Sequence, residues 1–101
     1  PHRFSRLSHH FEEFSTCFND ADRVYVADVY AAGEDPIDGV SGPDLAKSLK
    51  SHGHKNASLT SKKTLAADLK PHIEKGDVVV CLGAGDITYW AADLAKDLEK
   101  V

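Results

Sequence analysis

Charged side chains that could bind a zwitterion occur in short segments of this 101-residue chain. Arg3 and Arg6 lie three residues apart, and a guanidinium group matches a carboxylate or phosphate through its planar fork of N–H donors. A second segment carries Asp28, Tyr30 and Glu34. The carboxylates of Asp28 and Glu34 could hold an ammonium group. An amino acid, or a polyphosphate beside one, is the kind of ligand that this combination predicts.

A third segment is a glycine turn between an apolar run and a helical pattern. The run 78–82 is short and wholly apolar, which is typical of a strand buried on both faces of a parallel sheet. Gly83-Ala84-Gly85 and Asp86 end it, and an amphipathic pattern begins at once. Backbone N–H groups at such a helix start bind phosphate or carboxylate readily. We therefore expect Asp86 and the glycine amides to lie at a ligand site.

Each of these segments also has a plainer interpretation. The two arginines could be solvated helix residues, and Asp28 and Glu34 could simply form turns. The glycines could form only a tight turn, because a dinucleotide fingerprint needs a third glycine and a later acidic residue. The chain has no G-x-x-x-x-G-K-[ST] phosphate loop and no G-x-S-x-G nucleophile elbow. An independent hydrolase is therefore disfavoured.

Strand and helix patterns alternate along the chain and would position these segments. Strands are expected over 23–29, 57–60 and 77–82, and helices over 41–53, 61–70 and 86–100. Ser41 and Ser61 are the expected N-caps, and Gly53 is the expected stop of the first of these helices. The alternation predicts an α/β fold with an open, mostly parallel sheet and helices on both faces. Ligands bind such sheets outside the carboxyl ends of the strands, where all three segments fall.

The first element does not follow this alternation. Large apolar residues at helical spacing predict an amphipathic helix that no strand precedes, namely Phe4, Leu7, Phe11, Phe14 and Phe18. A helix of a doubly wound fold normally follows a strand. We therefore expect residues 1–101 to form one domain that lacks its first strand, with Pro1–Arg6 as the loop leaving that strand.

Composition excludes several classes of function. The chain has 12 basic and 16 acidic residues, a net charge of −4 and no basic stripe, so nucleic acid is an unlikely partner. Its apolar runs are too short to cross a bilayer, and no signal peptide is visible. Cys17 and Cys81 look like small buried hydrophobes of a reducing compartment, with a disulfide as the alternative. The histidine clusters match no recognised zinc spacing, which favours surface histidines over a metal site: His9, His10 and Glu13, and His52 and His54.

Four motifs occur in order along the chain: PHRFSR (1–6), FNDAD (18–22), DVYAAGE (28–34) with PI (36–37), and CLGAGDI (81–87). Together they resemble the C-terminal domain of the Mur ligases of peptidoglycan synthesis, in the branch that joins L-alanine to UDP-N-acetylmuramate. The resemblance covers essentially the whole chain. It implies a Rossmann-like domain of a three-domain, cytoplasmic bacterial enzyme. Phe4 stands where many relatives are expected to carry a tyrosine.

The resemblance also implies roles for individual residues. ATP phosphorylates the lactyl carboxylate of UDP-N-acetylmuramate, and the amine of L-alanine displaces the phosphate. Arg3 and Arg6 would hold the alanine carboxylate and steady charge near the phosphates, with His2 beside them at the domain cleft. The loop that contains Asp28, Tyr30 and Glu34 would help to select the amino acid. Asp86 would be the acidic residue that follows the glycine turn.

The same resemblance limits what this chain can do alone. ATP and Mg²⁺ would be bound mainly by the nucleotide domain, and the UDP-sugar by a further domain, neither of which is present in residues 1–101. No catalytic residue is expected in this fragment alone, and we expect the isolated chain to be inactive. A free-standing Rossmann-like or flavodoxin-like module, nucleotide-binding or regulatory, is the alternative.

Overall fold

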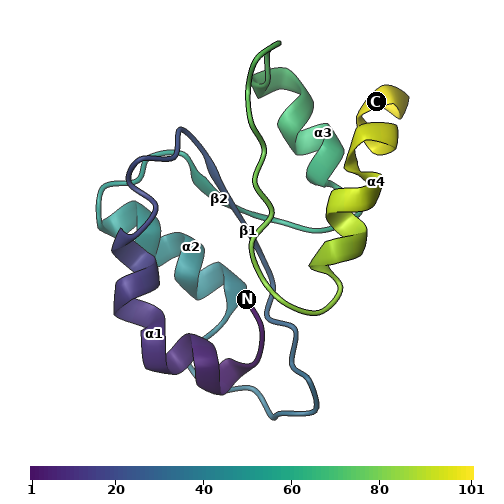
Figure 1. Cartoon of the computed structure of the whole chain (residues 1–101). Helices are drawn as coiled ribbons and strands as arrows, with labels where there is room; N and C mark the ends of the chain where they lie inside the picture. The colour runs from purple at the N-terminus through teal and green to yellow at the C-terminus, as the bar shows by residue number, and fades with distance from the viewer. The chain divides into compact units, whose positions relative to one another are not determined.

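The computed structural model describes residues 1–101 as two compact units, 1–60 and 61–101. The first unit contains α1 (Phe4–Thr16), β1 (Val24–Ala27), α2 (Gly42–Ser51) and β2 (Ala57–Thr60) (Figure 1). The two strands pair in parallel, with Val24 opposite Ala57 and Ala27 opposite Thr60. α2 forms the crossover between them, as parallel pairing requires. The predicted α/β class with a parallel sheet is confirmed.

α2 begins as its sequence predicts. The Ser41 hydroxyl accepts a hydrogen bond from the Asp44 backbone N–H at 3.1 Å and donates to the Asp44 carboxylate at 2.7 Å. Pro43 occupies the first turn, where its missing N–H costs nothing. Gly53 follows the helix with φ +100°, a backbone angle that favours glycine. The predicted cap and stop are both confirmed.

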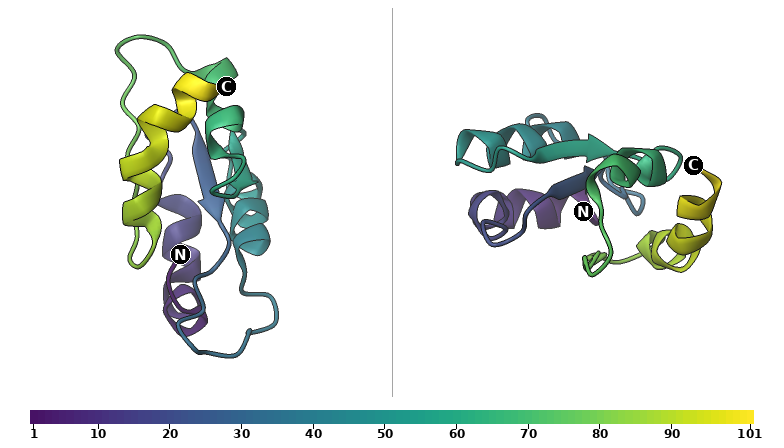
Figure 2. Two further views of the ribbon diagram at one scale, coloured as in Figure 1. Left: turned by 90° about the vertical axis from the view of Figure 1, so that its right-hand side faces the viewer. Right: turned by 90° about the horizontal axis from the view of Figure 1, so that it is seen from above.

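The core of the first unit joins both helices to both strands. Leu7 of α1 and Leu49 of α2 are fully buried, and they cluster with further apolar residues of α2 and of the two strands, namely Leu45, Ala46, Val26 and Ala57. Figure 2 shows α1 and α2 side by side next to the strands. The apolar face of the first helix therefore packs as its periodicity predicts, although the helix ends at Thr16 rather than Phe18.

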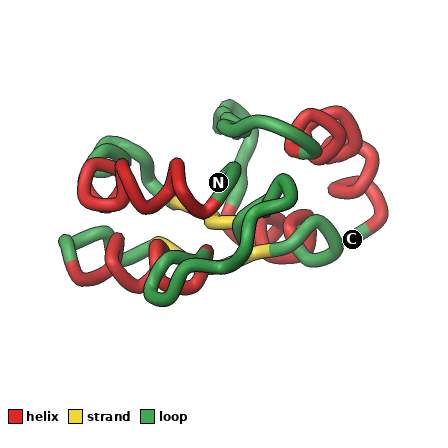
Figure 3. Tube along the Cα trace, turned by 90° about the horizontal axis from the view of Figure 1, so that it is seen from below, coloured by secondary structure: helices red, strands yellow, loops and turns green.

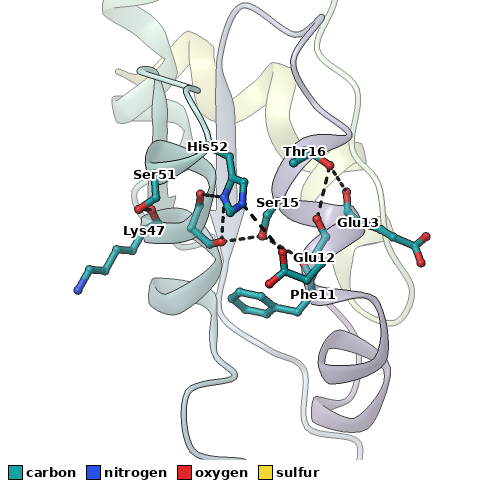
Figure 4. A network of polar contacts seen from close by, with 9 residues as sticks. Phe11, Glu12, Glu13, Ser15, Thr16, Lys47, Ser51 and His52 are labelled. Atoms are coloured by element: carbon teal, nitrogen blue, oxygen red, sulfur yellow. Dashed lines mark hydrogen bonds and ion pairs between the residues drawn. The ribbon is translucent and has the colours of Figure 1, made fainter.

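A polar seam lies between α1 and α2 within this packing (Figure 4). Ser15 is fully buried, and its hydroxyl donates to the Phe11 carbonyl at 2.8 Å. The Ser48 hydroxyl lies 2.7 Å from that of Ser15, so Ser48 is the donor of this pair. His52 Nδ1 lies 2.8 Å from the Ser48 carbonyl, which fixes Nδ1 as the protonated nitrogen. The seam thereby satisfies its buried hydroxyl groups.

The second unit contains α3 (Leu65–Leu69), a 3₁₀ turn at Lys70–His72, and α4 (Ile87–Lys100). α3 and α4 pack together, and Lys62 forms an ion pair with Asp93 at 3.0 Å. The prediction that Ser61 caps the first helix here is wrong. Ser61 instead opens a turn closed by N–H donation from Thr64 to its carbonyl, and α3 starts only afterwards.

The run Val78–Leu82 is not a strand, so this prediction is wrong for the structure. It is extended chain without β pairing and leads into α4 (Figure 3). Val78 is 83% exposed and Val80 68% exposed. The apolar pattern is suited to a sheet interior, but a strand forms only where a neighbour accepts its backbone hydrogen bonds, and the described sheet has two strands.

The predictions about the burial of Cys17, Cys81 and the apolar face of α4 hold only in part. Cys17 is exposed, because it lies just beyond the end of α1 where the chain turns away from the apolar face. Cys81 is partly buried, and both thiols are free. The apolar face expected for α4 is fully buried only at Leu94.

Candidate functional site

The segment Pro1–Arg6 is bound by backbone hydrogen bonds to Tyr30, in the loop that follows β1. Tyr30 donates its N–H to the Pro1 carbonyl at 2.9 Å, and the Arg3 N–H donates to the Tyr30 carbonyl at 2.7 Å. The two bonds form a parallel bridge between His2 and Tyr30. The rings of these two residues are also stacked, with centroids 5.2 Å apart and planes 16° from parallel. The predicted neighbours His2, Arg3 and Tyr30 are thus brought together.

Arg3 has an unusual backbone conformation for a residue with a side chain. Its φ is 61° and its ψ is 137°, a region that non-glycine residues rarely occupy and that costs on the order of 1–3 kcal/mol. The hydrogen bond to Tyr30 and the bond from the Leu7 N–H to the Arg3 carbonyl, 3.2 Å long, hold it there. Such strain persists only where the surroundings determine the conformation, and it is common at binding sites.

The guanidinium groups of Arg3 and Arg6 are available to a ligand. Both residues are exposed, and the ion pairs of the chain involve neither of them. Arg3 precedes α1 and Arg6 lies in its first turn. The segment therefore presents two unpaired positive charges three residues apart, as the sequence predicts.

The Glu34 carboxylate contacts the start of α1. Its Oε1 accepts from the Ser5 backbone N–H at 3.1 Å, and its Oε2 accepts from the Ser5 hydroxyl at 2.6 Å. The hydroxyl bond, followed by the backbone bond, lowers the pKa of Glu34 below its ordinary value of 4.5. A nearby backbone N–H of Phe4 and the charge of Arg3 act in the same direction. Glu34 is therefore a carboxylate at neutral pH.

The Asp28 carboxylate accepts a hydrogen bond from the first residue of α2. Its Oδ1 accepts from the Val29 N–H at 2.8 Å and from the Gly42 N–H at 3.3 Å. Gly42 lies so close to β1 that a Cβ there would be 2.8 Å from the Ala27 carbonyl oxygen. Only glycine fits, because that neighbour is backbone and cannot move aside.

Asp86 belongs to the second unit. It precedes α4 without making a side-chain cap, and its Oδ2 accepts a hydrogen bond from Trp90 Nε1 at 3.3 Å. The glycine turn before it adopts positive φ at Gly83 and Gly85, as a tight turn requires. The predicted turn and the helix after it are confirmed.

Two structurally important residues were missed by the sequence analysis. Ser5 stands between the two arginines, and only its place in the motif PHRFSR marks it. Gly42 follows a capping serine and precedes Pro43, so a glycine in the first turn of a helix was the available signal.

Other candidate sites are less developed. The prediction that His54 is a surface histidine is wrong: it is buried, its Nε2 donates to the Ala21 carbonyl at 2.8 Å, and its Nδ1 has no partner. Residues 1–101 contain no group of three or more His, Cys, Asp or Glu side chains arranged to hold a metal ion. None of the helices combines the length and the apolar character needed to cross a membrane.

Comparison with known proteins gives consistent results over nearly the whole chain. Residues 3–85 match the family model described as "Mur ligase, glutamate ligase domain". A UDP-N-acetylmuramate–L-alanine ligase of Maricaulis maris is 58% identical over 99 residues, covering 98% of this chain. Proteins of the same name from Rhodospirillum centenum and Sinorhizobium fredii are 56% and 55% identical, over 98% and 100% of the chain. The chain spans only 21–22% of the length of these relatives.

Proposed function

We propose a function from one premise: this chain belongs to the Mur ligase family, whose glutamate ligase domain matches residues 3–85. In this proposal it is the C-terminal, amino-acid-binding domain of a bacterial, cytoplasmic ligase that joins L-alanine to UDP-N-acetylmuramate. Relatives with that name match 98% or more of the chain, which favours this function over a free-standing regulatory module.

One observation carries the proposal for the site. Arg3 and Arg6 present unpaired guanidinium groups on a segment whose backbone is bound to the loop beyond the carboxyl end of β1, through the 2.7 Å bond from Arg3 to Tyr30. The carboxyl end of a parallel strand is where ligands bind in α/β sheets. A guanidinium pair fixed at this place suits the carboxylate of an amino acid.

The residues of this chain would act by binding and orientation. Arg3 and Arg6 would hold the alanine carboxylate through charge-assisted hydrogen bonds, with His2 and Tyr30 as the stacked wall beside them. The alanine amine, after losing a proton to solvent, would then attack the acyl carbon of the phosphorylated sugar carboxylate. The new C–N bond would replace the C–O bond to phosphate, and inorganic phosphate would leave. Fixing one reactant in this way can supply much of the rate enhancement of a ligation. Asp28, Glu34 and Asp86 remain proposed parts of the surroundings of this site.

ATP would supply the activation of the sugar carboxylate. Residues 1–101 contain no phosphate-loop motif and no cluster of three or more side chains suited to Mg²⁺. We assign the sites for ATP and Mg²⁺ to the larger part of the ligase, because this chain corresponds to 21% of the length of its relatives.

The domain in the full protein would contain a larger sheet. β1 pairs with β2, and beyond the carboxyl end of β1 the single bridge between His2 and Tyr30 is also parallel. We assign to this sheet a further strand, which ends at Pro1–Arg6. The exposed apolar run Val78–Leu82 would be a paired strand in the full protein, since its composition suits burial on both faces.

The full-length ligase carrying Arg3→Ala or Arg6→Ala tests the site. Each change removes a charge-assisted contact of about 1.5–3 kcal/mol, so kcat/KM for L-alanine should fall at least about tenfold. Arg→Lys should recover little, because an ammonium group lacks the planar fork. Arg23→Ala is the matched control, since Arg23 is exposed and lies outside the site. Unchanged alanine kinetics in both site variants would overturn the assignment.

A further inference from the structure

Glu34 connects the loop after β1 to the first turn of α1. Both of its carboxylate oxygens are engaged by one residue, Ser5, through the backbone N–H at 3.1 Å and the hydroxyl at 2.6 Å. The two residues are 29 positions apart in the sequence. This is a tertiary contact between two segments that both belong to the proposed site.

α1 has no side-chain cap of its own. Arg3 at the N-cap position makes no capping hydrogen bond, and the first turn contains no acidic residue. The first N–H groups of a helix lack intrahelical partners and carry the positive end of the helix dipole. Glu34 supplies from another element both the acceptor and the negative charge that this turn lacks.

Ser5 lies between the two arginines of the proposed site. A shift of its backbone would move Arg3 and Arg6 together, because all three residues share one turn. We propose that Glu34 is a positioning residue for the amino-acid site, acting through Ser5 to fix the direction of the two guanidinium groups. This inference rests on the proposed function, in which those groups bind the alanine carboxylate.

The local geometry supports positioning rather than direct ligand contact. The Glu34 N–H donates to the Ala31 carbonyl at 3.0 Å, which closes a turn over Ala32 and Gly33. Both of these residues have positive φ, 51° and 86°. A constrained turn thus aims the carboxylate at Ser5. The lowered pKa of Glu34, caused first by the Ser5 hydroxyl, agrees with a carboxylate committed to this partner.

The test uses the full-length ligase and steady-state kinetics for each substrate. Ser5→Ala and Glu34→Ala should each raise KM for L-alanine about tenfold, since small misplacements of binding groups are costly. The KM for ATP should stay within about twofold, because the change is confined to the amino-acid site. The double variant should be no worse than Glu34→Ala alone, because that change already removes both bonds to Ser5. Ser5→Thr keeps the hydroxyl and should retain wild-type kinetics.

A control and three outcomes complete the test. Asp35→Ala removes an exposed carboxylate from the same loop and should have no effect. If Glu34→Ala raises the alanine KM but Ser5→Ala does not, Glu34 contacts the substrate directly and the inference is overturned. If neither changes it while Arg3→Ala does, the inference fails and the proposed function stands. If the arginine variants also leave the alanine KM unchanged, both the inference and the proposed function fail.

Discussion

Arg3 combines a strained backbone with a side chain that the site needs. Its φ of 61° is one that glycine adopts far more readily than arginine. The hydrogen bonds to Tyr30 and from Leu7 keep the residue in place. Replacing Arg3 by glycine should therefore weaken binding while relieving the backbone strain.

Arg3→Gly should make the chain more stable than Arg3→Ala does. Glycine relieves the strain at positive φ, whereas alanine keeps the Cβ that causes it, and the difference should be about 1 kcal/mol, or roughly 4–8 °C in Tm for a domain of this size. Both variants lose the guanidinium, so both should raise the alanine KM of the full-length ligase. The Tm values of the two variants, measured by thermal unfolding, test this expectation. A lower Tm for Arg3→Gly would show that the backbone is not strained.

Glu34 predicts a specific response to acid. Its pKa is lowered in the folded state, first by the Ser5 hydroxyl, so its contribution to stability is complete above the ordinary value of 4.5 and is lost as the pH falls through the lowered pKa. As the pH falls below 4.5, the Glu34→Gln variant should therefore lose less free energy of unfolding than the wild type. Above pH 4.5, the variant should be less stable than the wild type by a constant amount. Urea unfolding between neutral pH and about pH 3 measures both parts. Parallel curves for the two proteins would contradict this role.

At the scale of single residues, the sequence predicts local roles such as capping and turn formation well. It predicts poorly which distant side chains contact one another. The arginine pair, the capping Ser41 and the turn at Gly83 could all be identified, because local spacing or chemistry marks them. The partner of Glu34 could not, because Ser5 is 29 positions away and only the fold brings them together.

Between elements, the seam of α1 and α2 depends on a chain of hydroxyl donors. Ser15 is fully buried, and Ser48 donates to it over 2.7 Å. Ser15→Ala would leave the Ser48 hydroxyl without this acceptor.

We expect Ser15→Ala to lower the free energy of unfolding by about 1 kcal/mol, the usual net value of one such hydrogen bond. Ser48→Ala should cost a similar amount, and the double variant less than the sum, because the pair is shared. Denaturant unfolding of the three variants provides the cycle, with Ser51→Ala on the exposed side of α2 as control. Strict additivity would indicate that the two hydroxyls act independently.

The elements that sequence predicts best are those whose pattern is completed locally. The strand 57–60 and the start of α2 are found where expected. The run Val78–Leu82 fails for a different reason, since hydrophobicity indicates how well a strand can be buried but not whether a neighbour is present to pair with it.

At the scale of the whole molecule, the exposed run Val78–Leu82 allows a test of whether these residues form a buried strand in the full protein. Val80→Lys should change the Tm of the 101-residue chain little, because Val80 is 68% exposed there and surface changes are usually within about 0.5 kcal/mol. In the full-length ligase the same change should lower the Tm by several degrees, because a buried unpaired ammonium group is costly. Val101→Lys, at a residue that is 55% exposed, is the control. An equal effect in both proteins would exclude a buried strand at 78–82.

The carboxylates of Asp28 and Glu34 have one more consequence. Asp28 accepts from a backbone N–H at the start of α2, and Glu34 does the same at the start of α1. The positive ends of both helix dipoles are therefore offset by carboxylates of the protein itself. An anion that binds here would therefore be attracted mainly by the guanidinium groups of Arg3 and Arg6. Its capture should therefore weaken as dissolved salt rises, since exposed charges are screened over about 10 Å at 0.1 M ionic strength. It should also favour flat, two-oxygen carboxylates over rounder anions, because the selectivity comes from the fork of the arginine and not from a ring of amides.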